Sequence, residues 1–150
     1  MATFTSHSPE ETRALGWRWG QAASPGTVFG LTGDLGSGKT QLVKGIAEGL
    51  GCSGKVRSPT FALLHHYAGG RLPFYHLDLY RLSSVEEIER AGLADYFACP
   101  DGVVAVEWFE RWRPVENATP STPGGANLAR IFLRIGGENE RTIVYDHPGL

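Results

Sequence analysis

The residues best suited to chemistry in this 150-residue chain form one run, GDLGSGKT, from Gly33 to Thr40. The run fits G-x-x-x-x-G-K-[ST], the pattern of a phosphate-binding P-loop. Glycines let such a backbone fold around a phosphate with its N–H groups turned inward. Lys39 can reach the β- and γ-phosphates, and the Thr40 hydroxyl can ligate Mg²⁺. The alternative is a glycine-rich turn that carries an exposed lysine.

The segments on either side of this run predict the strand and the helix that a P-loop requires. Thr27 to Thr32, directly before it, is a short β-prone run. After it, apolar residues recur at helical spacing until Gly49 and Gly51 supply stop signals. The start of that helix would point unpaired N–H groups and the positive end of its dipole at the loop. The expected nucleotide-binding residues are Gly33, Asp34, Leu35, Gly36, Ser37, Gly38, Lys39, Thr40 and Gln41.

Two acidic residues follow apolar runs and are candidates for the metal side of the site. Glu107 follows VVAV, and Asp78 follows FYHL. A carboxylate at the C-terminal end of a strand lies where ligands bind in open α/β sheets. Glu107 is the first choice for Mg²⁺, together with Thr40, whereas Asp78 could hold metal-bound water or a neighbouring arginine. We assign catalytic roles to Lys39, Asp78 and Glu107; the alternative for each carboxylate is a surface position at a strand end.

A short segment between the expected P-loop helix and the next strand could sense the γ-phosphate. Ser58-Pro59-Thr60 occupies the interval where P-loop switch proteins often carry such a sensor. Pro59 restricts the backbone of Ser58 and so sets the approach of Thr60. A simple turn that leads into a strand fits the spacing equally well.

Histidine and tryptophan side chains also lie near these candidates. His65 and His66 are neighbours in an expected strand, so they face opposite sides and cannot readily share a metal. His76 is two residues before Asp78, and we interpret it as a packed or hydrogen-bonding side chain rather than a catalytic one. Trp108 follows Glu107 and could be a core residue or pack beside a nucleotide.

The composition favours a cytoplasmic protein that does not bind nucleic acid by itself. The net charge is −2, and no basic run supplies an electrostatic footprint for nucleic acid. No apolar run is long enough to span a membrane, and the N-terminal residues lack the features of a signal peptide. Cys52 and Cys99 are isolated in the sequence, which favours free thiols in a reducing compartment.

The remaining pattern predicts one small α/β domain over residues 1–150, with a P-loop NTPase-like fold. The central sheet should be mainly parallel, with antiparallel additions and flanking helices. Capping signals predict helices from Ser8 to about Ala23 and from Ser84 to Gly92. Residues 114–127 are expected to be a flexible surface loop. The other predicted strands are Phe61–Tyr67, Leu72–Leu77, Val103–Val106, Leu128–Ile135 and Arg141–Tyr145.

Two motifs that the sequence does not contain narrow the choice of nucleotide and reaction. No N-K-x-D sequence follows the apolar strands, so ATP is favoured over GTP. No arginine-rich lid segment of the kind found in small nucleotide kinases is evident. ATP and Mg²⁺ are therefore the expected cofactors.

Several motifs in order resemble those of the TsaE (YjeE) family, bacterial ATPases of tRNA threonylcarbamoyladenosine biosynthesis. They are the N-terminal E-E-T-x-x-L-G, GDLGSGKT, SPTF, H-L-D-L-Y-R-L and V-E-W, which together extend from Glu10 to Trp108. Two departures fall at Gln41, where relatives often have a second threonine, and at Phe109, where proline is common. The second departure and the loop over 114–127 make the C-terminal third the least similar part.

The resemblance implies an ATPase that supports turnover of the TsaD and TsaB proteins, with tRNA contacted only indirectly through that complex. It also implies that Thr40 and Glu107 occupy the Mg²⁺-associated positions, and that Asp78 and Thr60 respond to the nucleotide state. Thr12 and Arg141 fall in segments that could flank the nucleotide. Two other functions stay open at this point: a small-molecule kinase in which Asp78 orients the acceptor hydroxyl, and a nucleotide-sensing adaptor that does not hydrolyse ATP.

Overall fold

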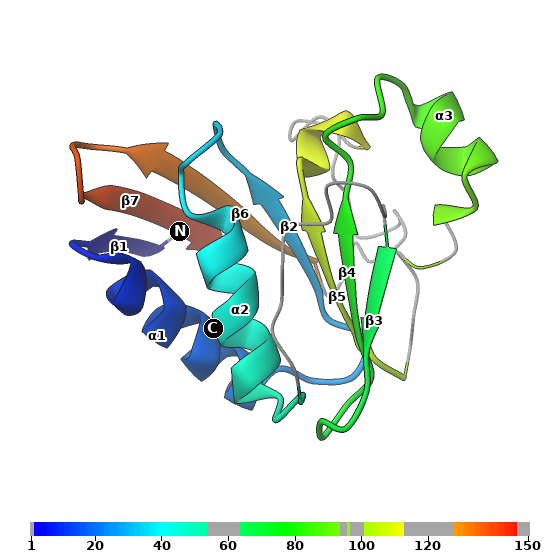
Figure 1. The fold of residues 1–150 in the computed structure, drawn as a ribbon, viewed down its shortest axis with the longest axis horizontal. Helices are drawn as coiled ribbons and strands as arrows, with labels where there is room; N and C mark the ends of the chain where they lie inside the picture. Colours follow the sequence, from blue (N-terminus) through cyan, green and yellow to red (C-terminus); the bar gives the residue numbers. More distant parts are fainter. Residues whose placement is uncertain (1, 54–63, 94–95, 97–100, 113–127, 147–150) are drawn as a thin grey trace.

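A computed structural model of the chain describes residues 2–53, 64–93, 96, 101–112 and 128–146 (Figure 1). The described part contains one seven-stranded sheet, three α-helices and a short 3₁₀ helix, η2. In chain order the elements are β1 (Ala2–Ser6), α1 (Pro9–Ala22), β2 (Val28–Thr32), α2 (Lys39–Gly49), β3 (Leu64–Tyr67), β4 (Phe74–Asp78), α3 (Val85–Arg90), β5 (Val103–Glu107), η2 (Phe109–Arg111), β6 (Leu128–Ile135) and β7 (Arg141–Asp146).

The sheet has the mixed character expected from the sequence. Its strand order is β1-β7-β6-β2-β5-β4-β3. The four central strands, β6, β2, β5 and β4, pair in parallel, whereas β1, β7 and β3 are added antiparallel at the two sides. The carboxyl ends of β2, β4 and β5 therefore lie at one edge of the sheet, which is where ligands bind in open α/β folds.

Each face of the sheet has its own hydrophobic core, and the alternation of side chains decides which residues enter it. On one face, α1 and α2 lie side by side over the sheet (Figure 1), and Leu15, Leu42 and Ile46 pack against Phe29 and Ile131. On the other face, α3 and η2 contribute a second cluster that includes Val104 and Val106 of β5. All four residues VVAV of β5 are fully buried, because helices or loops cover both faces of this central strand.

Helices α1 and α2 approach so closely that their backbones touch along a line of four glycines, here called the glycine seam: Gly16, Gly20, Gly45 and Gly49. A Cβ atom at Gly45 would lie 2.0 Å from the Arg13 carbonyl oxygen, and one at Gly49 would lie 2.1 Å from that of Trp17. At both Gly16 and Gly20 the same hypothetical atom would lie 2.3 Å from a carbonyl oxygen of α2. No side chain larger than hydrogen fits at these positions unless the two helices move apart.

Both ends of α1 are held by side-chain hydrogen bonds. Ser8 caps its start by accepting a hydrogen bond from the Glu11 amide at 3.1 Å, as the capping signal predicts. At its C-terminal end, Arg71 donates to the carbonyl oxygens of Gly20, Gln21 and Ala23 at 2.7–3.1 Å. A positive charge is favourable there because it faces the negative end of the helix dipole.

The strands and helices agree with the sequence predictions except at the N-terminus. The edge strand β1 was not predicted, since Phe4 is its only large apolar residue and the segment offers no clear alternation. The predicted loop over 114–127 and the first residues of the strand predicted from Phe61 lie outside the described residues. In the described part of the chain, no helix is long and apolar enough to span a membrane.

Candidate functional site

The glycine-rich run forms a tight loop between β2 and α2, and here it is called the glycine loop (Gly33–Thr40). Gly36 and Gly38 have φ angles of +79° and +104°, which favour glycine strongly over other residues. A Cβ atom at Gly33 would lie 2.6 Å from Ser37 Oγ and 2.7 Å from the Leu133 carbonyl oxygen. The loop therefore uses its glycines for turning and for close packing, and it delivers Lys39 and Thr40 to the first turn of α2.

Lys39 is buried, and its ammonium group folds back over the loop. Its Nζ atom donates to the carbonyl oxygens of Gly33 and Asp34, the latter at 3.0 Å, and lies 4.1 Å from the centre of the Trp108 ring. Burial lowers the pKa of Lys39, and the charges of Glu107, Glu110, Asp78 and Asp34 oppose that change. A positive charge that has been partly removed from water is well suited to attract an anion into the loop.

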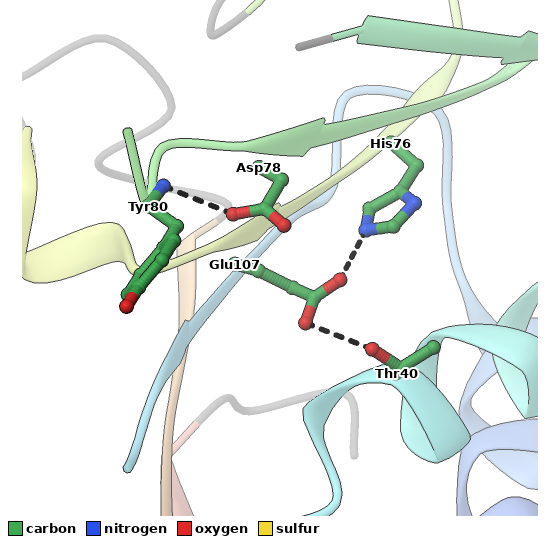
Figure 2. A network of polar contacts seen from close by, with 5 residues as sticks. All are labelled: Thr40, His76, Asp78, Tyr80 and Glu107. Carbon is green, nitrogen blue, oxygen red and sulfur yellow. Dashed lines mark hydrogen bonds and ion pairs between the residues drawn. The ribbon is translucent and has the colours of Figure 1, made fainter. Parts of the chain in front are cut away.

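Glu107, at the end of β5, is buried and accepts a hydrogen bond at each of its carboxylate oxygens (Figure 2). The Thr40 hydroxyl donates to Oε1 at 3.1 Å, and His76 Nε2 contacts Oε2 at 2.6 Å. Because an ionised carboxylate can only accept, Nε2 is the donor of the second bond. Donation by Thr40 leaves the lone pairs of its hydroxyl oxygen free for a ligand.

Asp78 lies directly across from Glu107 in the parallel register of β4 and β5. It is 7% exposed, and its Oδ1 atom accepts a hydrogen bond from the Tyr80 amide at 2.9 Å (Figure 2). The sequence placed both carboxylates at strand ends, and the register brings them to neighbouring positions at the same edge of the sheet. The alternative of two separate surface carboxylates does not fit their burial.

Trp108 provides a platform beside the loop. It has φ 60° and ψ 43°, and it is the one residue other than glycine with positive φ in the described ranges. Its ring lies 4.9 Å from that of Tyr80, and Arg111 Cζ lies 5.7 Å from its centre. Since left-handed backbone is unfavourable for a large side chain, the surrounding contacts must hold it there.

A pocket opens next to the glycine loop, on the side of α1. Its lining brings the N-terminal turn of α1 together with the start of α2 and the β6–β7 turn. Arg141 joins these parts, because it donates to the Gly36 carbonyl at 3.1 Å and to the Gly137 and Glu140 carbonyls at 2.9 Å. The lining residues are Ser8, Pro9, Thr12, Gly36, Gly38, Gln41, Glu138, Asn139 and Arg141.

The structure thus brings together most of the residues selected from the sequence. Lys39, Thr40, Asp78 and Glu107 meet at the ends of the central strands, and Gln41 lines the adjoining pocket. Ser58 and Thr60, the possible γ-phosphate switch, lie outside the described residues. The sequence did not reveal that His76 bonds to Glu107. It did indicate the correct face for the His76 side chain, because residues 76 and 78 are two apart in one strand.

Comparison with known proteins shows similarity over nearly the whole chain. Residues 6–143 match the family model described as threonylcarbamoyl adenosine biosynthesis protein TsaE. The tRNA threonylcarbamoyladenosine biosynthesis protein TsaE of Bacillus subtilis is 40% identical over 142 residues, covering 95% of this chain and 83% of that protein. The protein of the same name from Nostoc sp. is 45% identical over 135 residues, covering 88% and 77%.

A solved structure supports the same assignment. The crystal structure of YdiB from Bacillus subtilis aligns with a TM-score of 0.68 at 32% sequence identity, covering 96% of this chain and 83% of that one. The similarity therefore includes the α1 segment, the glycine loop and the strands that carry both carboxylates. On these grounds the chain belongs to the TsaE family, which acts in tRNA threonylcarbamoyladenosine biosynthesis.

Proposed function

We propose that the chain is an ATP-binding and ATP-hydrolysing subunit of the cytoplasmic machinery for tRNA threonylcarbamoyladenosine modification. The observation that carries this proposal is the meeting of Lys39 and Thr40 with the buried carboxylates of Glu107 and Asp78. A flexible glycine-rich turn with a surface lysine would not require two buried acids beside it. The pattern of the loop and the chemistry of these side chains both favour a nucleoside triphosphate with its Mg²⁺.

Each residue then has a defined task. The Lys39 ammonium group neutralises charge on the phosphates, which is the main contribution a protein makes to phosphoryl transfer. The Thr40 hydroxyl and the Glu107 carboxylate would hold Mg²⁺, directly or through water, and oxygen atoms are the ligands this ion prefers. Bound Mg²⁺ would neutralise charge on the β- and γ-phosphates. Asp78, whose carboxylate accepts a hydrogen bond from the Tyr80 amide, would orient water near the same ion.

The pocket beside the loop is suited to the nucleoside part of the ligand. Gly36, Gly38 and Gln41 line it together with Thr12 and Arg141, and Arg141 donates a hydrogen bond to the Gly36 carbonyl. Thr12 and Arg141 are the two residues whose segments, by the family resemblance, could flank the nucleotide. We therefore assign this pocket to the base and ribose.

The reaction on tRNA belongs, in this proposal, to the partner proteins TsaD and TsaB. The net charge of −2 and the one small sheet of the described residues favour a subunit that supports turnover of the complex, rather than one that binds tRNA directly. Among the residues that the structure describes, no general base for water stands out beside the carboxylates, so hydrolysis by the isolated chain should be slow. A partner would then supply ordering or a missing group, as activating proteins do for other P-loop enzymes.

Reconstitution with TsaD, TsaB, tRNA and ATP tests this proposal. Lys39→Ala should reduce ATP hydrolysis and multiple-turnover tRNA modification by about 100-fold or more, because a charge-stabilising group is lost. The variant should still fold, since burial already disfavours the charged lysine. Lys44→Ala in the same helix is the matched control, and its activity should stay within about twofold of the wild type because Lys44 lies outside the glycine loop.

Three outcomes would change the proposal. Near-normal tRNA modification by a folded Lys39→Ala variant would contradict it. Equal multiple-turnover modification with a non-hydrolysable ATP analogue would favour a nucleotide-sensing adaptor. A phosphorylated small molecule formed in the absence of any protein partner would favour a kinase.

A further inference from the structure

A buried histidine outside the glycine loop makes the second contact to Glu107. His76 lies on β4, its ring is fully buried, and its Nε2 atom is 2.6 Å from Glu107 Oε2 (Figure 2). Its other ring nitrogen, Nδ1, is also buried and has no hydrogen-bond partner among the described residues. Among the described residues, the hydrogen bond to Glu107 is therefore the polar contact that compensates for removing this ring from water.

We propose that His76 is a positioning residue that fixes the Glu107 carboxylate for the metal. This inference rests on the proposed function, because it assigns Glu107 to Mg²⁺. Side chains that hydrogen-bond to metal ligands typically change metal affinity 10–100-fold when they are removed. His76 would act through Glu107 and would not itself touch the ion or the nucleotide.

The length of the glutamate side chain gives a physical reason for this arrangement. P-loop enzymes commonly hold Mg²⁺ with an aspartate at the corresponding strand end, whereas this chain has Glu107. The extra methylene adds a rotatable bond, and its conformational freedom is lost when the carboxylate is held in one position. Thr40 restrains one carboxylate oxygen, and His76 restrains the other from the neighbouring strand.

Strand geometry keeps the histidine in register with the carboxylate. His76 pairs with Ala105, and Asp78 pairs with Glu107, so His76 reaches Glu107 diagonally from the adjacent strand. His76 shares its face with Asp78 because the two are separated by one residue. The position of the His76 donor is thus fixed by a strand of the sheet and does not depend on a loop.

Two amide substitutions of different length separate positioning from packing. His76→Gln places an amide nitrogen close to the position of Nε2, whereas His76→Asn carries the same amide but is one methylene too short. The measurement is the Mg²⁺ concentration that half-maximally enhances binding of a fluorescent non-hydrolysable ATP analogue, compared with binding in EDTA. We expect His76→Asn and His76→Phe to raise that concentration about 10-fold, and His76→Gln to stay within about threefold of the wild type. Binding in EDTA should change less than about twofold in all three, a result that damage to packing alone would not give.

Two further variants make the outcome decisive. His66→Gln is the matched control. His66 on β3 stacks on Tyr75, on the face of the sheet opposite His76, so this substitution should leave the Mg²⁺ requirement unchanged. Glu107→Gln should remove most of the Mg²⁺ enhancement. If Glu107→Gln does so while the Asn and Gln variants at position 76 respond alike, His76 is not a positioning residue and the proposed function stands. If the wild type binds no nucleotide, both proposals are wrong.

Discussion

The glycine seam and the carboxyl edge of the sheet, where Asp78 and Glu107 end their strands, are built on opposite principles. In the seam, hydrogen atoms of glycine lie against carbonyl oxygens, and a Cβ atom at Gly45 would lie only 2.0 Å from the facing backbone. At the carboxyl edge, two acids, a lysine and a histidine are buried side by side. The first region is held by close contact of backbones, and the second by a few polar bonds among groups that individually resist burial.

The difference separates the most closely packed part of the fold from the part to which we assign the proposed chemistry. The backbone at the edge includes the left-handed conformation of Trp108, and burial lowers the pKa of Lys39. Such unfavourable features persist only where the rest of the structure holds them in place. The tightly packed pair α1 and α2 lies on one face of the sheet and carries Lys39 at the start of α2, whereas Trp108 packs against the hydrophobic cluster on the other face.

The largest effect should come from a substitution in the seam. Gly45→Ala places a methyl group against the Arg13 carbonyl, and since backbone cannot give way, the helices must separate. We expect a loss of about 3 kcal/mol or more in the free energy of unfolding, measured by urea denaturation. The control is Gly92→Ala, where φ is +75° and a Cβ atom would meet nothing within 4 Å.

The control measures the effect of backbone conformation without crowding. Gly92→Ala should cost about 1 kcal/mol, because alanine adopts a left-handed conformation less readily than glycine. If Gly45→Ala costs no more stability than Gly92→Ala, the two helices can move apart at the glycine seam without loss of stability. That result would contradict the claim that close backbone contact stabilises the seam.

A smaller effect is expected at Trp108. Trp108→Gly and Trp108→Ala both remove the ring from Lys39, Arg111 and Tyr80, but only glycine adopts φ 60° without strain. The glycine variant should therefore be more stable than the alanine variant by about 1 kcal/mol. Thermal unfolding of the pair measures this difference, and equal stabilities would show that the backbone at the carboxyl edge is unstrained.

The smallest effect is expected in α3, whose Ile88 packs in the hydrophobic cluster on the face of the sheet opposite the seam. Glu87 accepts hydrogen bonds from the amide and hydroxyl of Ser83 at 2.9 and 3.1 Å, and the amide bond, followed by the hydroxyl bond, lowers its pKa below the ordinary 4.5. Because the pKa of Glu87 is lower in the folded state, its hydrogen bonds with Ser83 stabilise the fold above about pH 4.5. This stabilisation is lost as the pH falls further. Glu87→Gln should lower the melting temperature slightly at pH 7 and less at pH 3, whereas Glu89→Gln should show no such trend.

Most of the helices and strands could be predicted from local patterns in the sequence. Ser8 and Ser84 were identified as helix starts from capping signals, and both accept the expected hydrogen bonds, from Glu11 and Glu87 respectively. The buried run before Glu107 was identified as a central parallel strand from its continuous apolar character. These features depend on residues close together in the chain, so one sequence is sufficient to find them.

Other features depend on pairing between distant segments and could not be found in this way. Strand β1 exists because it pairs with β7, more than 130 residues away, and its own residues give little signal. The bond between His76 and Glu107 requires the register of β4 against β5. The close approach of α1 and α2 requires glycines on both helices to face each other, and the sequence shows only that glycines recur at a spacing of four.

The glycine seam also determines how the pocket beside the loop can select its ligand. One wall of that pocket comes from Ser8 and Thr12 of the α1 region, and another from Gly38 and Gln41 at the start of α2. Because the two helices are locked together along their backbones, these walls keep a fixed spacing before any ligand arrives. Selection there would follow preorganised shape rather than induced fit. Any closure upon binding would have to take place in parts of the chain that the seam does not join.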